Sequence, residues 1–286
     1  MIIGGYILTE TYTLADGLVV PKIGFGTYKL TGATGVNAIT SAIDAGYRLL
    51  DTAVNYENEG MVGEAIRRTA VPRAQLTITS KLPGRHHHYQ EAIATIEESL
   101  YRAGLDYYDL YLIHWPNPIT GQYVEAWQAL IDAQRFGLVR SIGVSNFLPE
   151  HLEKLQKETG ILPVINQIEL HPYFNQAAQR QFDTNHQILT EAWSPLGRGT
   201  RNNVLQDPVI QQLAEKYHHT AGQIILRWQT QMNVLPIPKS THLKRQIENL
   251  TIFDFELSDT DRAKIDALTK VDGRYSQQDP AKYEEF

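Results

Sequence analysis

Short apolar runs alternate with amphipathic stretches along almost the whole chain. The runs have the length of buried strands, and the stretches carry apolar residues at the spacing of a helix face. The predicted strands span residues 23–28, 47–50, 76–81, 109–114, 139–144, 164–167, 188–193 and 233–238. The predicted helices lie around 36–43 and at 61–69, 90–103, 123–136, 149–159, 176–185, 207–218, 220–231 and 243–249, with a last one opening at 258–261.

This alternation and the total length predict an α/β fold, a (β/α)8 TIM barrel, as one domain over residues 1–286. A β-hairpin at 12–20, with Asp16 and Gly17 as its turn, is expected to cover the N-terminal mouth. The segment after Val271 lacks periodicity and is expected to form a loop near the other mouth, where the active site lies. Gly24, Gly26 and Gly32 miss the G-x-G-x-x-G spacing, so a Rossmann fingerprint is rejected.

Composition narrows the function classes. The 286 residues are 42% hydrophobic and 20% charged, which is typical of a soluble globular protein. The net charge of −6 does not favour binding to nucleic acid or to an acidic membrane, since both are negatively charged. No apolar run is long enough to span a membrane. The absence of cysteine excludes thiolate chemistry and fits a reducing compartment, so we expect a cytoplasmic protein.

Polar side chains follow the apolar runs, where a barrel gathers its functional groups. They are Asp51, Lys81, His114, Ser145, Asn146, Gln167, Trp193, Ser194, Lys239 and Ser240. Each has an ordinary structural explanation: Asp51 could cap a helix, Lys81 could lie on the surface, and His114 or the nearby Tyr56 could simply pack. The barrel topology nevertheless brings these four side chains together at one mouth.

Together they suit acid catalysis. The pKa of an ordinary phenol is too high for a ready proton donor near neutral pH. An ammonium at Lys81 would lower the pKa of Tyr56, and Asp51 would hold the lysine in place. His114 can orient a substrate oxygen by a hydrogen bond. Such an acid suits a carbonyl that accepts hydride, and a cofactor must then supply the hydride.

The loops after the seventh and eighth predicted strands indicate a phosphate-binding site, which this fold often places there. One loop spans 194–199 and the other spans Lys239, Ser240 and Thr241 before a short helix that carries Arg245. Cations beside a helix start suit phosphate, although a glycine loop and a capped helix would look the same.

Eight motifs in order resemble the aldo-keto reductases. They are Gly-Tyr-Arg-Leu-Leu-Asp-Thr-Ala at 46–53, Tyr-Glu-Asn-Glu at 56–59, Thr-Ser-Lys-Leu at 79–82, Leu-Tyr-Leu-Ile-His-Trp-Pro at 110–116, Ile-Gly-Val-Ser-Asn-Phe at 142–147, Asn-Gln-Ile-Glu-Leu-His-Pro at 166–172, Trp-Ser-Pro-Leu-Gly-Arg-Gly at 193–199 and Ile-Pro-Lys-Ser at 237–240. The resemblance implies a barrel that reduces aldehydes and ketones with NADPH. It implies Tyr56 as general acid, Lys81 and Asp51 as its tuning pair, and His114 as the residue that orients the carbonyl.

The resemblance also implies cofactor contacts. The nicotinamide carboxamide would be held by Ser145, Asn146 and Gln167, and the ribose would lie along Gly26, Thr27 and Asp51. The pyrophosphate would be held by Ser194, Leu196 and Gly197. The 2′-phosphate would be bound by Lys239, Ser240, Thr241 and Arg245, and the adenine would lie near Glu248 and Asn249. Trp193 stands where the family commonly stacks a tyrosine on the nicotinamide. Because Lys239 and Arg245 are both present, NADPH is expected over NADH.

The loop after His114 is short, as in the smaller bacterial members similar to 2,5-diketogluconate reductases. It implies an open pocket for small dicarbonyls and keto-sugars, walled by Tyr28, Tyr56, His114 and Trp115. We expect a monomer, and no metal, because the adjacent histidines at 86–88 cannot easily share one ion.

Two other functions remain open. A non-catalytic NADP-binding barrel, similar to the channel β subunits that resemble this family, would not need all four catalytic candidates. A barrel isomerase or aldolase could use Lys81 as a Schiff base and would need no nicotinamide.

Overall fold

The computed structural model describes the whole chain except residues 1, 4–5, 8–9, 199–202 and 276–277. Eight parallel strands form one central sheet, and their order in the sheet follows their order along the chain. They are β5 (Phe25–Gly26), β6 (Leu49–Asp51), β7 (Thr77–Leu82), β8 (Tyr108–Ile113), β9 (Val139–Ser145), β10 (Ile165–Glu169), β11 (Leu189–Trp193) and β12 (Val234–Pro236). The first strand is shorter than expected because the backbone turns at Thr27, whose carbonyl accepts a hydrogen bond from Leu30 N at 2.9 Å.

The sheet closes on itself. Gly24 N donates to Pro236 O at 2.9 Å, and Gly26 N donates to Pro238 O at 3.0 Å, so the first strand continues the ladder of the last. A Cβ atom on Gly26 would lie 3.0 Å from the carbonyl oxygen of Ile237, so the two backbones approach closely at this glycine. The predicted (β/α)8 barrel is therefore confirmed.

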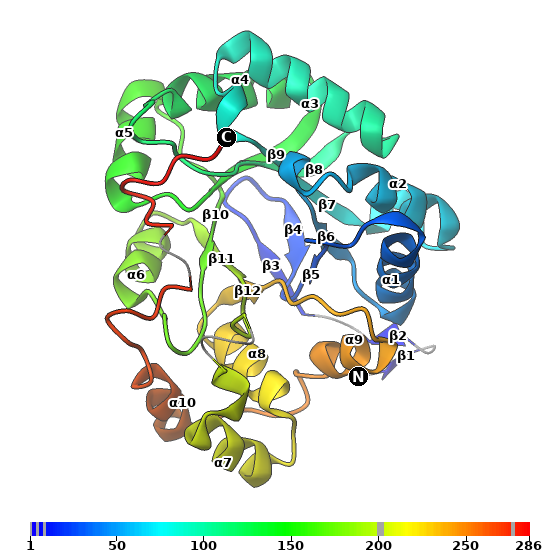
Figure 1. Cartoon of the computed structure of the whole chain (residues 1–286), viewed down its shortest axis with the longest axis vertical. Coiled ribbons are helices and arrows are strands. Elements are labelled where there is room, and N and C mark those ends of the chain that lie inside the picture. Colours follow the sequence, from blue (N-terminus) through cyan, green and yellow to red (C-terminus); the bar gives the residue numbers. More distant parts are fainter. Residues whose placement is uncertain (1, 4–5, 8–9, 199–202, 276–277) are drawn as a thin grey trace.

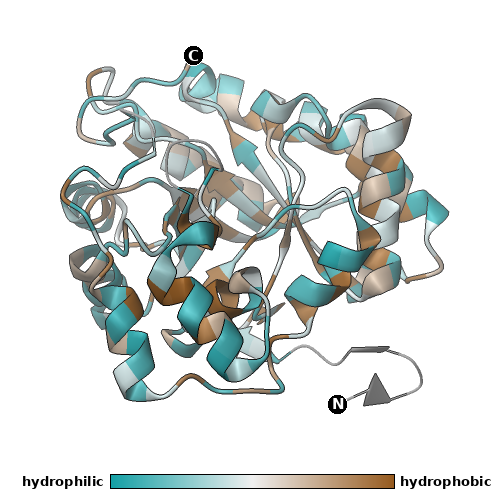
Figure 2. Cartoon of the chain, turned by 60° about the horizontal axis from the view of Figure 1, so that its bottom comes forward, coloured by the Kyte–Doolittle hydropathy of each residue, from teal (hydrophilic) through white to brown (hydrophobic). Residues whose placement is uncertain are grey.

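Helices surround the strands (Figure 1). They are α1 (Gly32–Ala45), α2 (Glu59–Arg68), α3 (Tyr89–Ala103), α4 (Tyr123–Arg135), α5 (Pro149–Thr159), α6 (Ala177–Asn185), α7 (Pro208–Tyr217), α8 (Ala221–Gln231), α9 (Leu243–Leu250) and α10 (Asp259–Asp266). Their hydrophobic residues face the strands and their hydrophilic residues face outward (Figure 2). The predicted start of α8 is confirmed, because the Thr220 hydroxyl accepts from Gln223 N in a capping box.

A hairpin closes the N-terminal mouth of the barrel. It consists of β3 (Thr11–Thr13) and β4 (Val19–Pro21), and its Leu14 and Val20 are buried among residues of the barrel interior. The Ser141 hydroxyl donates to Asp16 in the hairpin turn at 2.6 Å. The predicted hairpin and its position are thus confirmed. A second, unexpected pair, β1 (Ile2–Ile3) with β2 (Tyr6–Ile7), precedes it.

The C-terminal segment crosses the opposite mouth. After α10 it passes α6 and α5 and ends near β8 (Figure 1). Lys270 N donates to Tyr173 O at 2.9 Å, and Gly84 N donates to the Glu285 carboxylate at 3.1 Å. The loop expected near this mouth is therefore present. In the described part of the chain, no helix is both long and apolar enough to cross a membrane.

Candidate active site

An ion pair and a phenol lie together at the C-terminal ends of β6 and β7. Both carboxylate oxygens of Asp51 are within 2.8 Å of Lys81 Nζ. The same ammonium donates to Thr52 O at 2.9 Å and lies 3.4 Å from the hydroxyl of Tyr56, which follows β6 in a short 3₁₀ turn. Lys81 is fully buried, and Asp51 is the acid in direct contact with its charge.

The protonation states in this cluster are set by burial and charge together. Burial raises the pKa of Tyr56 to about 12, and the Lys81 ammonium offsets only part of that rise. Burial by itself would lower the pKa of Lys81, but Asp51 and Tyr56 outweigh it and raise that pKa. Lys81 lowers the pKa of the phenol as expected, but the loss of hydration raises that pKa by more, so the net shift is upward. Tyr56 is a protonated phenol beside a lysine cation.

His114 follows β8 and faces the same space. Its ring centre lies 5.7 Å from that of Tyr56, edge to face, and Tyr28 packs on the other side of Tyr56 at 5.0 Å. Its Nδ1 atom lies 2.8 Å from a carboxylate oxygen of Glu285, the penultimate residue of the chain. The structure thus brings Asp51, Tyr56, Lys81 and His114 together, three of them along one cavity and Lys81 directly beneath it.

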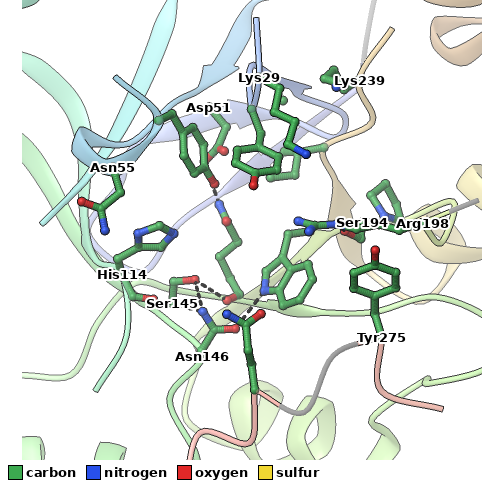
Figure 3. Close-up of a pocket in the computed structure, with 18 of the residues that line it drawn as sticks. Lys29, Asp51, Asn55, His114, Ser145, Asn146, Ser194, Arg198, Lys239 and Tyr275 are labelled. Atoms are coloured by element: carbon green, nitrogen blue, oxygen red, sulfur yellow. Dashed lines mark hydrogen bonds between the residues drawn. The ribbon is translucent and has the colours of Figure 1, made fainter. Parts of the chain in front are cut away.

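The cavity has a volume of about 620 Å³ and opens at the C-terminal mouth (Figure 3). Its lining includes these residues singled out from the sequence: Gly26, Tyr28, Asp51, Tyr56, His114, Trp115, Ser145, Asn146, Gln167, Trp193, Ser194, Leu196, Gly197 and Lys239. Lining residues that the sequence did not single out individually include Lys29, Asn55, Arg198, Tyr275, Tyr283 and Glu285. Three of these belong to the C-terminal segment, which has no periodic signal and could be proposed as a wall only as a whole.

Amide and hydroxyl groups form one end of the cavity. Trp193 Nε1 donates to Asn146 Oδ1 at 2.8 Å, and Asn146 Nδ2 donates to His114 O at 3.0 Å. The Ser145 hydroxyl donates to the backbone oxygen of Gln167 at 2.8 Å. Asn146 itself has a left-handed backbone with φ of 64°, which aims its side chain across the strand ends (Figure 3). This corner can hold a planar amide against the Trp193 ring.

A second buried acid, Glu191, lies beneath that corner. Gln167 Nε2 donates to Asp51 Oδ2 at 2.8 Å and to Glu191 Oε2 at 2.9 Å. With both protons used inward, the Gln167 amide oxygen remains to accept a hydrogen bond from a ligand. Burial and the neighbouring Asp51 raise the pKa of Glu191 above its ordinary value. Glu191 was not among the predicted site residues, although an acid inside the apolar run 188–193 was a usable signal.

The other end of the cavity is cationic. Lys29, Arg198 and Lys239 line it (Figure 3). Burial, Lys29 and Arg198 together lower the pKa of Lys239, which shows how closely these positive charges meet. The Arg198 guanidinium lies 5.1–5.5 Å from the ring centres of Tyr28, Trp193 and Tyr275. Such a group of cations fits an anionic ligand, phosphate above all.

The remaining predicted cofactor residues do not line this cavity. They are Thr27, Ser240, Thr241, Arg245, Glu248 and Asn249. Thr27 is buried and donates to Asp51 O at 2.9 Å. The other five residues come after Lys239 in the chain, either in the loop after β12 or in α9. Arg245 of α9 is exposed, and the Glu248 carboxylate lies 3.8 Å from Lys244 Nζ. Gly199, in the predicted phosphate loop, lies outside the described residues.

The histidines at 86–88 do not converge. His86 Nδ1 lies 2.8 Å from the Thr95 hydroxyl, whereas His88 Nε2 lies 3.0 Å from Gln122. His87 is buried between them, and burial lowers its pKa to about 4. Among the residues that the structure describes, no group of three or more His, Cys, Asp or Glu is placed to hold a metal ion.

Comparison with known proteins places this chain in a family. The sequence model of the Aldo/keto reductase family matches residues 22–270. A 2,5-diketo-D-gluconic acid reductase B of Corynebacterium sp. is 50% identical over 277 residues, which cover 96% of this chain and 98% of the relative. The methylglyoxal reductase DkgA of Escherichia coli is 42% identical, over 94% of this chain and 96% of its own.

Solved structures agree with the sequence matches. The apo form of Gox0644 superposes with a TM-score of 0.90 at 40% identity, covering 97% of this chain and 99% of its own. A Gox0644 mutant in complex with NADPH superposes with a TM-score of 0.92 over the same shares of the two chains. The chain therefore belongs to the aldo/keto reductase family.

Proposed function

We propose that this protein reduces small aldehydes and ketones to alcohols with NADPH, and that Tyr56 is the general acid. The observation that carries the proposal is the Tyr56 phenol beside the buried Lys81–Asp51 pair, at the floor of a cavity that His114 also faces. A binding protein would have no need to bury an ion pair against a phenol, because an ion pair inside a barrel costs desolvation free energy.

The residues present fit NADPH. The cations Lys29, Arg198 and Lys239 suit its phosphates, and the flat Trp193 ring beside Asn146 and Gln167 suits the nicotinamide and its carboxamide. NADPH, when bound, supplies the hydride. We propose that the nicotinamide is held by Ser145, Asn146, Gln167 and Trp193, and that the ribose lies along Gly26, Thr27 and Asp51. The pyrophosphate is then held by Ser194, Leu196 and Gly197. The 2′-phosphate is held by Lys239, Ser240, Thr241 and Arg245, and the adenine lies near Glu248 and Asn249.

The protein's part in the reaction is the handling of one proton. As the carbonyl carbon gains hydride, its oxygen becomes anionic and takes the proton of the Tyr56 hydroxyl. The phenolate left on Tyr56 is stabilised by the Lys81 ammonium 3.4 Å away, which Asp51 keeps in place. A positioned acid of this kind contributes about 10²- to 10⁴-fold to a rate. Because the pKa of Tyr56 is about 12, the proton is present throughout the neutral range.

The substrate class follows from the shape and from the relatives. Relatives are named for diketogluconic acid, methylglyoxal and glyoxal, all compounds with adjacent or paired carbonyl groups. Tyr28, His114 and Trp115 line the cavity near Tyr56, so its wall combines aromatic faces with a polar ring nitrogen. We therefore propose small dicarbonyls and keto-sugars as substrates, and a cytoplasmic monomer of one domain, residues 1–286, as the working form.

The test is the loss of reduced-nicotinamide absorbance with NADPH, then NADH, against a panel of such carbonyls. Tyr56→Phe should lose activity by about 10²-fold or more while it still binds NADPH. Tyr101→Phe is the matched control, since Tyr101 is 82% exposed and lies outside the cavity. Equal turnover by Tyr56→Phe and Tyr101→Phe would refute Tyr56 as the acid.

Two other functions have less support. A non-catalytic NADP-binding barrel would bind NADPH and turn over nothing on the panel. A Schiff-base enzyme needs a free lysine in its cavity, whereas Lys81 is fully buried and paired with Asp51. Borohydride should therefore trap no adduct on Lys81.

A further inference from the structure

Gln167 and Glu191 lie side by side on β10 and β11. The two residues are paired in the register of these parallel strands, and both side chains are buried. Gln167 lines the cavity, whereas Glu191 is not among its lining residues. Glu191 comes two residues before Trp193 on β11, so these two side chains leave the same face of the strand. A buried acid therefore lies behind the end of the cavity that we propose for the nicotinamide.

The amide nitrogen of Gln167 donates to two acids. Its Nε2 atom lies 2.8 Å from Asp51 Oδ2 and 2.9 Å from Glu191 Oε2. Asp51 is paired with the Lys81 ammonium, so its oxygens accept, and the amide nitrogen rather than the amide oxygen has to face it. One such bond would fix the position of the nitrogen and leave the amide free to rotate about it. The second bond fixes the plane of the amide, and with it the direction of the amide oxygen.

The backbone of Gln167 is held separately. Its carbonyl oxygen accepts from the Ser145 hydroxyl at 2.8 Å and from Asn146 N at 2.9 Å. Loss of the Glu191 side chain would therefore leave the main chain of Gln167 in place. What depends on Glu191 is the orientation of the Gln167 side chain.

Packing does not account for an acid at position 191. Glu191 is fully buried, and an apolar side chain would avoid the free-energy cost of burying a carboxyl group. In the described part of the chain, the bond to Gln167 is the one hydrogen bond that this carboxyl group makes, and its Oε1 atom has no partner. That single bond indicates what the acid is for.

We propose that Glu191 is a positioning residue for the nucleotide. Together with Asp51 it fixes the Gln167 amide, so that Gln167 Oε1 stays free to accept a hydrogen bond from the carboxamide N–H of the nicotinamide. The inference rests on the proposed function and adds to it a residue that does not touch the cofactor. This role requires only an acceptor oxygen at the place of Oε2, so Glu191→Gln should preserve it.

The first experiment measures discrimination between two nucleotides by calorimetry. One is NADP⁺, and the other is its analogue with an acetyl group in place of the carboxamide, which has no N–H to donate. The wild type should bind NADP⁺ about 10-fold more tightly than the analogue. Glu191→Leu should raise the NADP⁺ Kd by about 3- to 10-fold and leave the Kd of the analogue nearly unchanged, so that most of the discrimination is lost. Glu191→Gln should keep the discrimination.

The matched control is Thr190→Val. Thr190 is the preceding residue of β11 and is also buried, but its hydroxyl donates to Asp183 at 3.0 Å rather than to the Gln167 side chain. This variant removes a buried hydrogen bond from the same strand and should keep the full discrimination. Urea unfolding of every variant measures the stability lost, and the loss of discrimination should not follow the loss of stability.

A second experiment repeats Glu191→Leu in a Gln167→Met background. Gln167→Met removes the amide and should by itself abolish the discrimination. Because Glu191 acts through that amide, adding Glu191→Leu should then change the NADP⁺ Kd no further. The two substitutions are thus expected to be fully non-additive for nucleotide binding.

Four results would overturn the proposal. They are a wild type that does not discriminate, undiminished discrimination in Glu191→Leu, an equal loss in Thr190→Val, and additive effects of Glu191→Leu and Gln167→Met on the NADP⁺ Kd. Failure of the reductase proposal is a separate result, because Tyr56→Phe would then retain turnover while the Kd values of the two nucleotides stay as predicted.

Discussion

The indole nitrogen of Trp193 donates a hydrogen bond of 2.8 Å to the side-chain oxygen of Asn146. The bond thus joins the residue that we propose to stack on the nicotinamide to one that we propose to hold its carboxamide. We predict that Trp193→Phe keeps the flat face but raises the NADPH Kd by about 3- to 10-fold, because Asn146 loses the donor that fixes its amide. Calorimetric titration with NADPH measures the change. An unaltered Kd would mean that the indole N–H plays no part in binding.

The buried pair Asp51 and Lys81 gives a prediction for stability as well as activity. Removing one partner leaves an uncompensated charge inside the barrel, so Asp51→Asn or Lys81→Met should each cost about 3–5 kcal/mol of unfolding free energy. The double variant leaves no charge and should cost clearly less than the sum of the two. Urea unfolding of the four proteins completes the cycle. Strict additivity would contradict a direct interaction, and all three variants should have lost carbonyl reduction.

Nucleotide selectivity should depend on the cations at the far end of the site. Lys239 lines the cavity, and Arg245 is exposed on α9 beyond it. We predict that Lys239→Met and Arg245→Met raise the NADPH Kd by about 10- to 100-fold and leave the NADH Kd nearly unchanged. Lys244→Met is the control, since Lys244 lies 3.8 Å from Glu248 on the same helix. A parallel loss for both nucleotides would place these cations on the pyrophosphate instead.

Strand ends were the part of the site that sequence could predict. Asp51 and His114 follow apolar runs, and in a barrel such positions converge whatever the details of packing. Tyr56 was different, because nothing in its local pattern separates it from a packing residue, and it became a candidate only through its expected position beside Asp51 and Lys81 and through the resemblance to a family. The barrel itself was predictable because every strand–helix unit repeats the same hydrophobic pattern.

Two features of the site could not be predicted, for physical reasons. The pKa of Tyr56 depends on how much water the folded site excludes, which a sequence does not state, so the rise in this pKa caused by burial was not predicted. The contact of Glu285 with His114 joins residues far apart in the chain, and the tail that makes it has no periodic pattern. Glu191 was partly predictable. The sequence shows an acid inside an apolar strand pattern, but the residues that Glu191 contacts are known only from the fold.

Asp183 links the stability of the protein to pH. Its carboxylate is fully buried at the end of α6, where it accepts from Gln179 at 2.9 Å and from the Thr190 hydroxyl at 3.0 Å. Burial outweighs these hydrogen bonds and raises the pKa of Asp183 from 3.8 to about 6. In the folded protein the proton therefore remains on Asp183 at pH values where the unfolded chain has released it.

Stability consequently falls as the pH rises between these two pKa values, and the loss is complete above the folded value. Two pKa units correspond to about 3 kcal/mol of unfolding free energy. We test this with Asp183→Asn, which is neutral at every pH and leaves all other titrating groups in place. The wild type minus variant difference in urea unfolding should move by about 3 kcal/mol in favour of the variant as the pH rises from below 3.8 to above about 6. A difference that stays constant would show that Asp183 has the same pKa in the folded protein as in the unfolded chain, and a shift toward the wild type would show that hydrogen bonding outweighs burial at this position.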